Sequence, residues 1–114
     1  MPTKKPSLKR LSPMDLYPGQ QSWESQSLWT YGPHKLRVLI DRDSYDFQST
    51  IRAFVWTASL EWSLVATIPF ELAPAPLKAV SYVQRPTDKI PERKAAFEEA
   101  ETLVLKAAVL VLAP

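Results

Sequence analysis

The chain has 114 residues, of which 46% are apolar, 23% are charged and 11% are aromatic. This length leaves room for one domain, since domains usually hold about 100 to 200 residues, and it excludes a multidomain enzyme. The balance of residue types excludes a disordered or fibrous chain. The chain has no cysteine, which excludes disulfides, thiol nucleophiles and thiolate metal sites.

Positive charge is concentrated near the N-terminus. The formal net charge is +2, yet residues 1–37 alone carry four more positive than negative charges. The basic residues that come first are Lys4, Lys5, Lys9 and Arg10. A basic end of this kind predicts either contact with an acidic partner such as nucleic acid or a solvated tail.

Targeting and membrane signals are weak in this sequence. The basic residues of positions 1–10 are not followed by an apolar stretch of about 7 to 15 residues, so we expect no secretory signal. Apolar runs such as 62–70 and 107–114 are far shorter than the roughly 20 residues of a membrane helix. We therefore expect a cytoplasmic protein without membrane contact.

Residues 1–33 contain five prolines and both glycines, with no sustained period of 2 or 3.6. This pattern predicts an extended, partly disordered, basic arm in front of a single domain over residues 34–114. The later half of the arm is too apolar for a solvated linker. We expect it to lie on a surface, either that of its own domain or that of a partner. Its apolar residues are Leu16, Tyr17, Trp23, Leu28, Trp29 and Tyr31.

Alternation of apolar and polar residues predicts three antiparallel strands, over residues 35–41, 45–57 and 60–68. Each strand has one side apolar enough to form a core. The residues expected on that side are Leu36, Val38, Ile40, Tyr45, Phe47, Ile51, Ala53, Val55, Trp62, Leu64, Ala66 and Ile68.

Two turns set the expected register. A two-residue turn at residues 58–59 would place Val55 opposite Trp62, which brings the apolar sides of the second and third strands together. In the first turn we expect Ile40 opposite Tyr45, because the alternative pairing opposes two aspartates. Prolines end the meander after residue 68, and residues 77–85 fit either an edge strand or a helical turn.

A long helix follows and runs to about Leu112, starting near two prolines that favour a helix beginning. A stripe at helical spacing should cover the core face of the sheet. Its members are Phe97, Ala100, Val104, Ala107, Ala108 and Val111, widened by Leu103 and Leu110. After Lys106 the helix is apolar nearly all round, which one sheet cannot cover. We therefore predict that Leu105, Val109 and Leu112 form a homodimer interface.

The sequence offers no catalytic or metal-binding constellation. His34 is the only histidine, and the aspartates of residues 41–46 lack the glycine and the glutamate that a calcium loop requires. Three glutamates over residues 98–101 fit a solvated helix face. We expect no enzyme activity, no metal and no cofactor.

The second face of the predicted sheet combines aromatic and basic residues. We expect Arg37, Arg52, Phe54 and Trp56 to lie there, facing away from the helix. Burial of such large side chains is favourable, so something should cover them: the chain's own arm, another protein chain, or single-stranded nucleic acid.

These patterns together predict an α+β fold, in which an antiparallel sheet of three to four strands packs on one long C-terminal helix behind an extended N-terminal arm. The predicted function is non-catalytic binding, by a homodimeric adaptor or inhibitor that engages a protein target through the aromatic and basic face. The alternative is a single-stranded nucleic-acid-binding protein that uses the same face together with Lys4, Lys5, Lys9 and Arg10.

Overall fold

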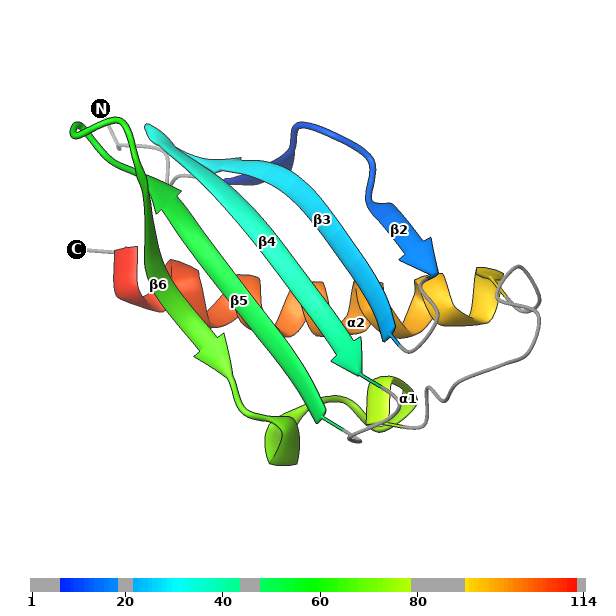
Figure 1. The fold of residues 1–114 in the computed structure, drawn as a ribbon. Coiled ribbons are helices and arrows are strands. Elements are labelled where there is room, and N and C mark those ends of the chain that lie inside the picture. The colour runs from blue at the N-terminus through cyan, green and yellow to red at the C-terminus, as the bar shows by residue number, and fades with distance from the viewer. Residues whose placement is uncertain (1–6, 19–21, 44–47, 79–89, 113–114) are drawn as a thin grey trace.

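The computed structural model describes residues 7–18, 22–43, 48–78 and 90–112. In these residues, six strands form one antiparallel sheet, and a long helix lies across one face of it (Figure 1). The strands are β1 (Leu8–Arg10), β2 (Asp15–Pro18), β3 (Ser22–Tyr31), β4 (His34–Asp43), β5 (Gln48–Trp56) and β6 (Trp62–Ile68). The helices are η1 (Phe70–Leu72), α1 (Ala75–Lys78) and α2 (Ile90–Leu112). The strand order is β1-β3-β4-β5-β6, with β2 also paired to β3, which confirms the α+β class.

The sheet has more strands than the three or four expected, because residues 8–31 supply β1, β2 and β3. Strand β3 pairs with β4 from Ser22 opposite Asp43 to Tyr31 opposite His34. The turn between them begins at Gly32, whose φ of 58° glycine adopts without steric penalty. The apolar half of the predicted arm is therefore part of the sheet rather than a segment laid over it.

Each strand presents one set of side chains to α2 and the other set away from it. We call the side that α2 covers the inner face and the opposite side the outer face. The described outer-face residues are Lys9, Asp15, Glu24, Gln26, Leu28, Thr30, Lys35, Arg37, Leu39, Asp41, Thr50, Arg52, Phe54, Trp56, Trp62, Leu64 and Thr67.

The register between β4 and β5 differs from the expected one, because Ile40 lies opposite Ile51 and not opposite Tyr45. Its partner is thus six residues further along the chain than expected. Since six is an even number, the residues of each strand keep the face predicted for them. Tyr45 and Phe47 lie outside the described residues.

The predicted two-residue turn before β6 is wrong. The loop spans residues 57–61 and is closed by a hydrogen bond from the Thr57 N–H to the Glu61 carbonyl at 3.0 Å. As a result Trp62 lies opposite Trp56, one residue from the expected partner. A shift by one residue exchanges the two faces of a strand.

The consequence is that Trp62 and Leu64 lie on the outer face instead of in the core. A register irregularity next to Ala53 then restores the expected face for the rest of β6. Ala66 and Ile68 accordingly pack against the core.

The core lies between the inner face and α2. Its aliphatic and aromatic members are fully or almost fully buried, and Phe97 has no exposed surface. The members that strands and helix contribute include Trp23, Leu36, Val38, Ile40, Ile51, Ala53, Phe97, Ala100, Val104, Leu105 and Ala108.

The buried stripe of α2 is rotated relative to the expected one. Leu105 is 1% exposed, whereas Leu110 and Val111 are 79% and 62% exposed. The reason is Glu101, which is buried on the same side as Leu105 and is held there by hydrogen bonds to the sheet. The hydrogen bonds of this buried carboxylate therefore help to set which side of α2 faces the sheet.

Glu101 is the centre of a buried polar network. The Ser27 hydroxyl donates to one oxygen of Glu101, and Arg10 forms an ion pair with the other. The indole N–H of Trp29 donates to Ser27 Oγ at 2.9 Å, and the Arg10 guanidinium lies 4.3 Å from the centre of the Trp29 ring. The network joins β1, β3 and α2, since a carboxylate is buried at low cost only when it is paired and hydrogen-bonded.

Arg42 holds α1 against the sheet. It is 1% exposed and donates from Nε to the Leu77 carbonyl at 3.1 Å and from Nη2 to the Lys78 carbonyl at 3.0 Å. Residues 77 and 78 are the last two residues of α1, so the segment 77–85 begins in a helix. Residues 79–85 lie outside the described part of the chain.

Candidate functional site

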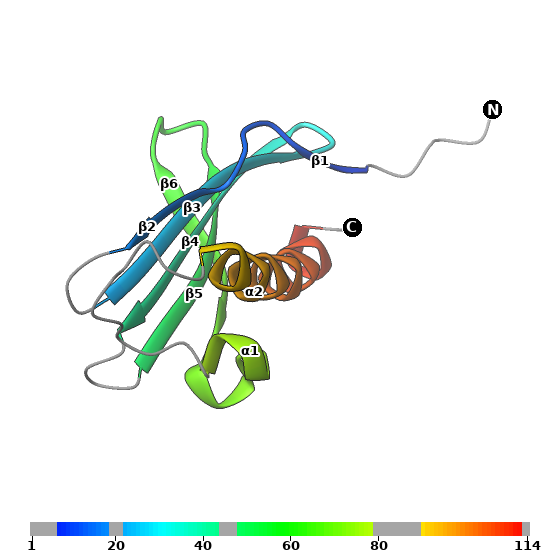
Figure 2. The same cartoon turned by 90° about the vertical axis from the view of Figure 1, so that its right-hand side faces the viewer.

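The predicted binding residues of the sheet meet on its outer face. In Figure 2 the described helices lie on one side of the sheet, and the other side carries no described helix or strand. The described aromatic residues of the predicted arm do not cover this side, because Trp23 and Tyr31 are buried on the inner face and Trp29 packs against the core.

The structure places the four predicted binding residues of the sheet together on the outer face. Arg37 lies opposite Phe54, and Arg52 lies opposite Leu39. Trp56 ends β5 on the same face and is 40% exposed. The alternation in the sequence was sufficient to bring these residues to one side of the sheet.

Arginines and aromatic rings are paired on this face. The Arg37 guanidinium lies 5.9 Å from the centre of the Trp62 ring, and the Arg52 guanidinium lies 5.6 Å from that of Phe54. Trp56 and Trp62 meet edge to face at 5.1 Å, with 67° between the ring planes. Such contacts hold large side chains in defined positions while their remaining surface stays accessible.

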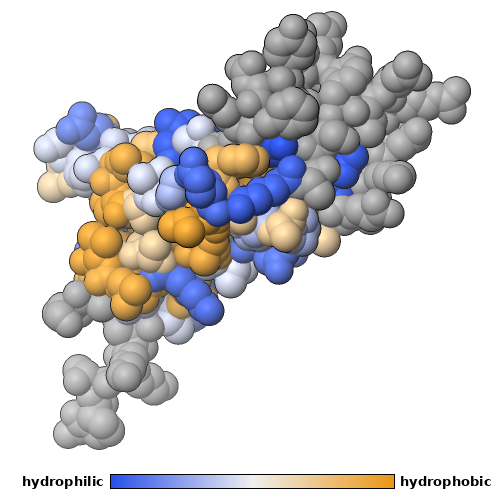
Figure 3. All heavy atoms as spheres, turned by 90° about the horizontal axis from the view of Figure 1, so that it is seen from below, coloured by the Kyte–Doolittle hydropathy of each residue, from blue (hydrophilic) through white to orange (hydrophobic). Residues whose placement is uncertain are grey.

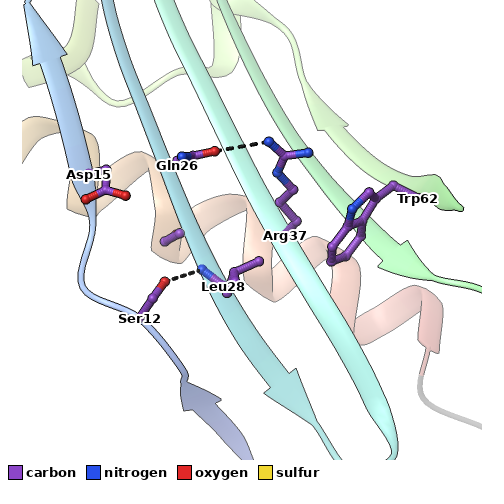
Figure 4. A pocket seen from close by; sticks show the side chains of 7 residues that line it. Ser12, Asp15, Gln26, Leu28, Arg37 and Trp62 are labelled. Carbon is purple, nitrogen blue, oxygen red and sulfur yellow. Dashed lines mark hydrogen bonds between the residues drawn. The ribbon is translucent and has the colours of Figure 1, made fainter.

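A trough runs over β3 and β4 on the outer face. Its two hollows have volumes of about 350 and 410 Å³, and both are lined by Gln26 and Arg37. Arg37 Nη2 donates to Gln26 Oε1 at 3.0 Å between them (Figure 4). Asp15 borders the first hollow on one side, and Trp62 borders it on the other. The trough therefore combines apolar side chains, an amide and charged groups within one concave surface.

Charges of both signs surround the aromatic centre. Lys9 and Lys35 flank Thr30 at the end of the sheet that holds the β3–β4 turn. Glu24 and Asp41 lie opposite each other at the other end. Arg52 Nη2 is 3.4 Å from Asp41 Oδ2, an exposed pair that contributes little to stability. The outer face is thus basic at one end and acidic at the other.

The predicted basic residues of the N-terminus have different locations. Lys9 is exposed on the outer face, whereas Arg10 points to the inner face and binds Glu101. Lys4 and Lys5 lie outside the described residues. Arg10 is therefore part of the structural network and is turned away from the other predicted binding residues.

The predicted homodimer residues of α2 are more buried than expected. Leu105 belongs to the core, and Val109 and Leu112 are half-buried against it. The side chains that α2 exposes near its end are Leu110 and Val111. Figure 3 shows hydrophobic residues gathered on the left, the side on which the C-terminal half of α2 lies in Figure 1.

A second, apolar groove lies between α2 and the β1 edge of the sheet. It has a volume of about 590 Å³ and is lined mainly by Leu8, Trp29, Leu105, Val109 and Leu110. Among the described residues, its polar border consists of Thr102 and Lys106. The groove is separated from the outer face by the sheet itself.

Sequence reasoning missed several outer-face residues. Trp62 and Leu64 were assigned to the core through the one-residue error in register. The sequence pattern predicts an arm in place of β2 and β3, so it does not indicate Gln26 or Asp15 as outer-face residues. The alternation of Glu24, Gln26 and Thr30 with aromatic residues over 22–31 is the signal that could have identified β3.

The described residues include no group of three or more His, Asp or Glu side chains placed to hold a metal ion. Among them, no helix has both the length and the apolar character needed to cross a bilayer. Comparisons with protein-family models, with curated proteins and with solved structures return no match to the chain. The geometry of the outer face is therefore the basis for assigning a function.

Proposed function

We propose that this protein is a non-catalytic binding module that docks another polypeptide on the outer face of its sheet. The observation that carries the proposal is the centre formed by Arg37, Arg52, Phe54, Trp56 and Trp62, over which no described helix or strand lies. Arginine and aromatic residues are the types most enriched where protein interfaces gain their binding energy. The surrounding charged residues match the polar rim of such an interface.

The charges of the outer face favour a polypeptide over a nucleic acid. Lys9, Lys35, Arg37 and Arg52 provide positive charge, as single-stranded nucleic acid requires. Three carboxylates lie on the same face, at Asp15, Glu24 and Asp41. They would repel a phosphate backbone that crossed the trough, because the trough is lined by all three. A protein surface can match both signs of charge.

Site-specific photo-crosslinking tests the proposal in the cells that produce the protein. A photoreactive amino acid replaces Leu64, which is 52% exposed at the rim of the outer face, or Leu110 as a control on α2. We expect a protein adduct from position 64 that is lost on Trp56→Ala or Arg37→Ala, and no such adduct from position 110. Adducts insensitive to both substitutions, or absent from position 64, would overturn the proposal.

Oligonucleotide titration tests the competing function. We expect no binding of labelled single-stranded or duplex oligonucleotides by the purified protein at low salt. Binding that weakens steeply as the salt concentration rises, and that is lost on Arg37→Ala, would replace the proposed function by nucleic-acid binding.

A further inference from the structure

The charges on the outer face of β4 are arranged in a graded order along the strand. Its four outer side chains are Lys35, Arg37, Leu39 and Asp41, from the turn end to the far end. The same order continues on the β3 side of β4, with Lys9 of β1 at the basic end and Glu24 of β3 at the acidic end, whereas on the β5 side Arg52 lies near Asp41. Val38 marks the middle of this order along β4.

A surface with opposite charges at its two ends can bind a second copy of itself in one orientation. A two-fold axis parallel to the strands would place the same positions of the two subunits opposite each other. Lys35 would then face Lys35 of the partner subunit and Asp41 would face Asp41 of the partner subunit, so that like charges repel at both ends. A two-fold axis that lies between the two sheets and crosses the strands reverses the order. Lys35 then faces Asp41 of the partner subunit, and both ends become attractive.

We propose that the polypeptide bound by the outer face is a second copy of this chain, related by a two-fold axis that crosses the strands at the level of Val38. This inference rests on the proposed function, because it names the partner of the same surface. The two sheets then stack face to face, with the α2 helix of each subunit on the outside.

The aromatic centre fits this arrangement as well as the charges do. On β5 the axis lies at the level of Ala53, the partner of Val38, so Arg52 and Phe54 are at equal distances on either side of it. Within one subunit the Arg52 guanidinium already lies 5.6 Å from the centre of the Phe54 ring. The axis places the Arg52 guanidinium of each copy over Phe54 of the partner subunit. Each ring then lies between two guanidinium groups, a favourable position for an aromatic ring.

The size of the face agrees with a modest dimer. With strands about 4.8 Å apart and a rise of about 3.3 Å per residue, the patch from Lys35 to Asp41 across the sheet covers roughly 500 to 600 Å² per copy. The total is near the lower limit of about 1,200 Å² for specific protein interfaces. We therefore expect a reversible dimer whose population rises with protein concentration.

Charge reversal within the purified full-length chain tests the orientation. Lys35→Glu places two acidic groups together, and Asp41→Lys places two basic groups together. Each variant should dissociate the dimer, raising its Kd by about tenfold or more, because apposed like charges are strongly unfavourable. The matched controls are Lys106→Glu and Glu99→Lys, which change the same charges at exposed positions of α2 and should leave the Kd unchanged.

Recombination of the two variants gives the decisive measurement. An equimolar mixture of Lys35→Glu and Asp41→Lys should form a heterodimer, because both contacts then join opposite charges, and the double variant should dimerise with itself. Sedimentation velocity measures each species. Failure of the mixture to associate, or a dimer unaffected by either single reversal, overturns the proposed orientation.

A purified wild-type protein that remains monomeric at all concentrations overturns the second copy as the partner. The proposed function is unaffected by that result if position 64 crosslinks to a different protein in cells. It fails when position 64 gives no polypeptide adduct, when the adduct is insensitive to both Arg37→Ala and Trp56→Ala, or when the oligonucleotide titration shows Arg37-dependent binding.

Discussion

On the inner face of the sheet Arg10 lies 4.3 Å from the centre of the Trp29 ring, and on the outer face Arg37 lies 5.9 Å from that of Trp62. Each pair consists of an arginine and a tryptophan, but the two arginines bind different acceptors. Arg10 forms an ion pair with the buried carboxylate of Glu101. Arg37 donates to the neutral amide of Gln26, so this hydrogen bond leaves its charge uncompensated.

The comparison shows how one residue pair can serve stability on one face and remain suited to binding on the other. The inner pair is anchored to the helix through Glu101 and contributes to joining three elements of the fold. The outer pair keeps a cation and an indole ring on the outer face, where they can contact a partner. Substitutions should therefore change the free energy of unfolding on the inner face and leave it nearly unchanged on the outer face.

The strongest contrast is expected between Phe97→Ala and Leu64→Ala. Phe97 has no exposed surface, and its truncation leaves a cavity under the sheet that should lower the free energy of unfolding by about 3–5 kcal/mol. Leu64 is 52% exposed, and its truncation should change this free energy by less than about 0.5 kcal/mol. Urea denaturation at low protein concentration measures both, and equal losses would contradict the assignment of faces.

The rotation of α2 predicts a second contrast, between two leucines of the same helix. Leu105→Ala should lower the free energy of unfolding by about 2–5 kcal/mol, since the side chain is 1% exposed. Leu110→Ala should change it by less than about 0.5 kcal/mol, since that side chain is 79% exposed. Thermal or urea unfolding decides the matter, and the reverse order would mean that the helix presents its other side to the sheet.

A smaller effect is expected for the buried network. Glu101→Ala leaves the Ser27 hydroxyl and the Arg10 guanidinium without their acceptor, which should cost about 1–3 kcal/mol of unfolding free energy. Glu98→Ala is the matched control, because Glu98 is exposed on the same helix. Similar unfolding midpoints for the two variants would show that the carboxylate at position 101 does not stabilise the fold.

The fold class and the faces of β4 and β5 could be predicted from the sequence, because the inner-face positions at the centre of both strands are apolar. The six-residue error in their register was harmless to this prediction, since an even shift preserves the faces. The one-residue error before β6 was not harmless, and it assigned Trp62 to the core. The predicted length of the loop between two strands therefore determines whether an error in register moves residues to the other face of the sheet.

The sequence signal for strand β3 is weak, because two of its inner-face residues are serines. Ser25 and Ser27 are buried, so the apolar alternation of this strand is interrupted in the sequence. Ser27 and Glu101 each resemble surface residues when read alone, and they are 74 positions apart. Only their hydrogen bond makes both of them core residues, and a local pattern contains no information about it. The same pair explains the error in the orientation of α2.

The irregular pairing between β5 and β6 has a consequence for how molecules of this protein can associate. Strand β6 is the last in the strand order, and a bulge bends its backbone next to the break in register at Ala53. A bent border is a poor template for the addition of further strands from neighbouring chains. Open-ended fibre growth through this border is thereby disfavoured.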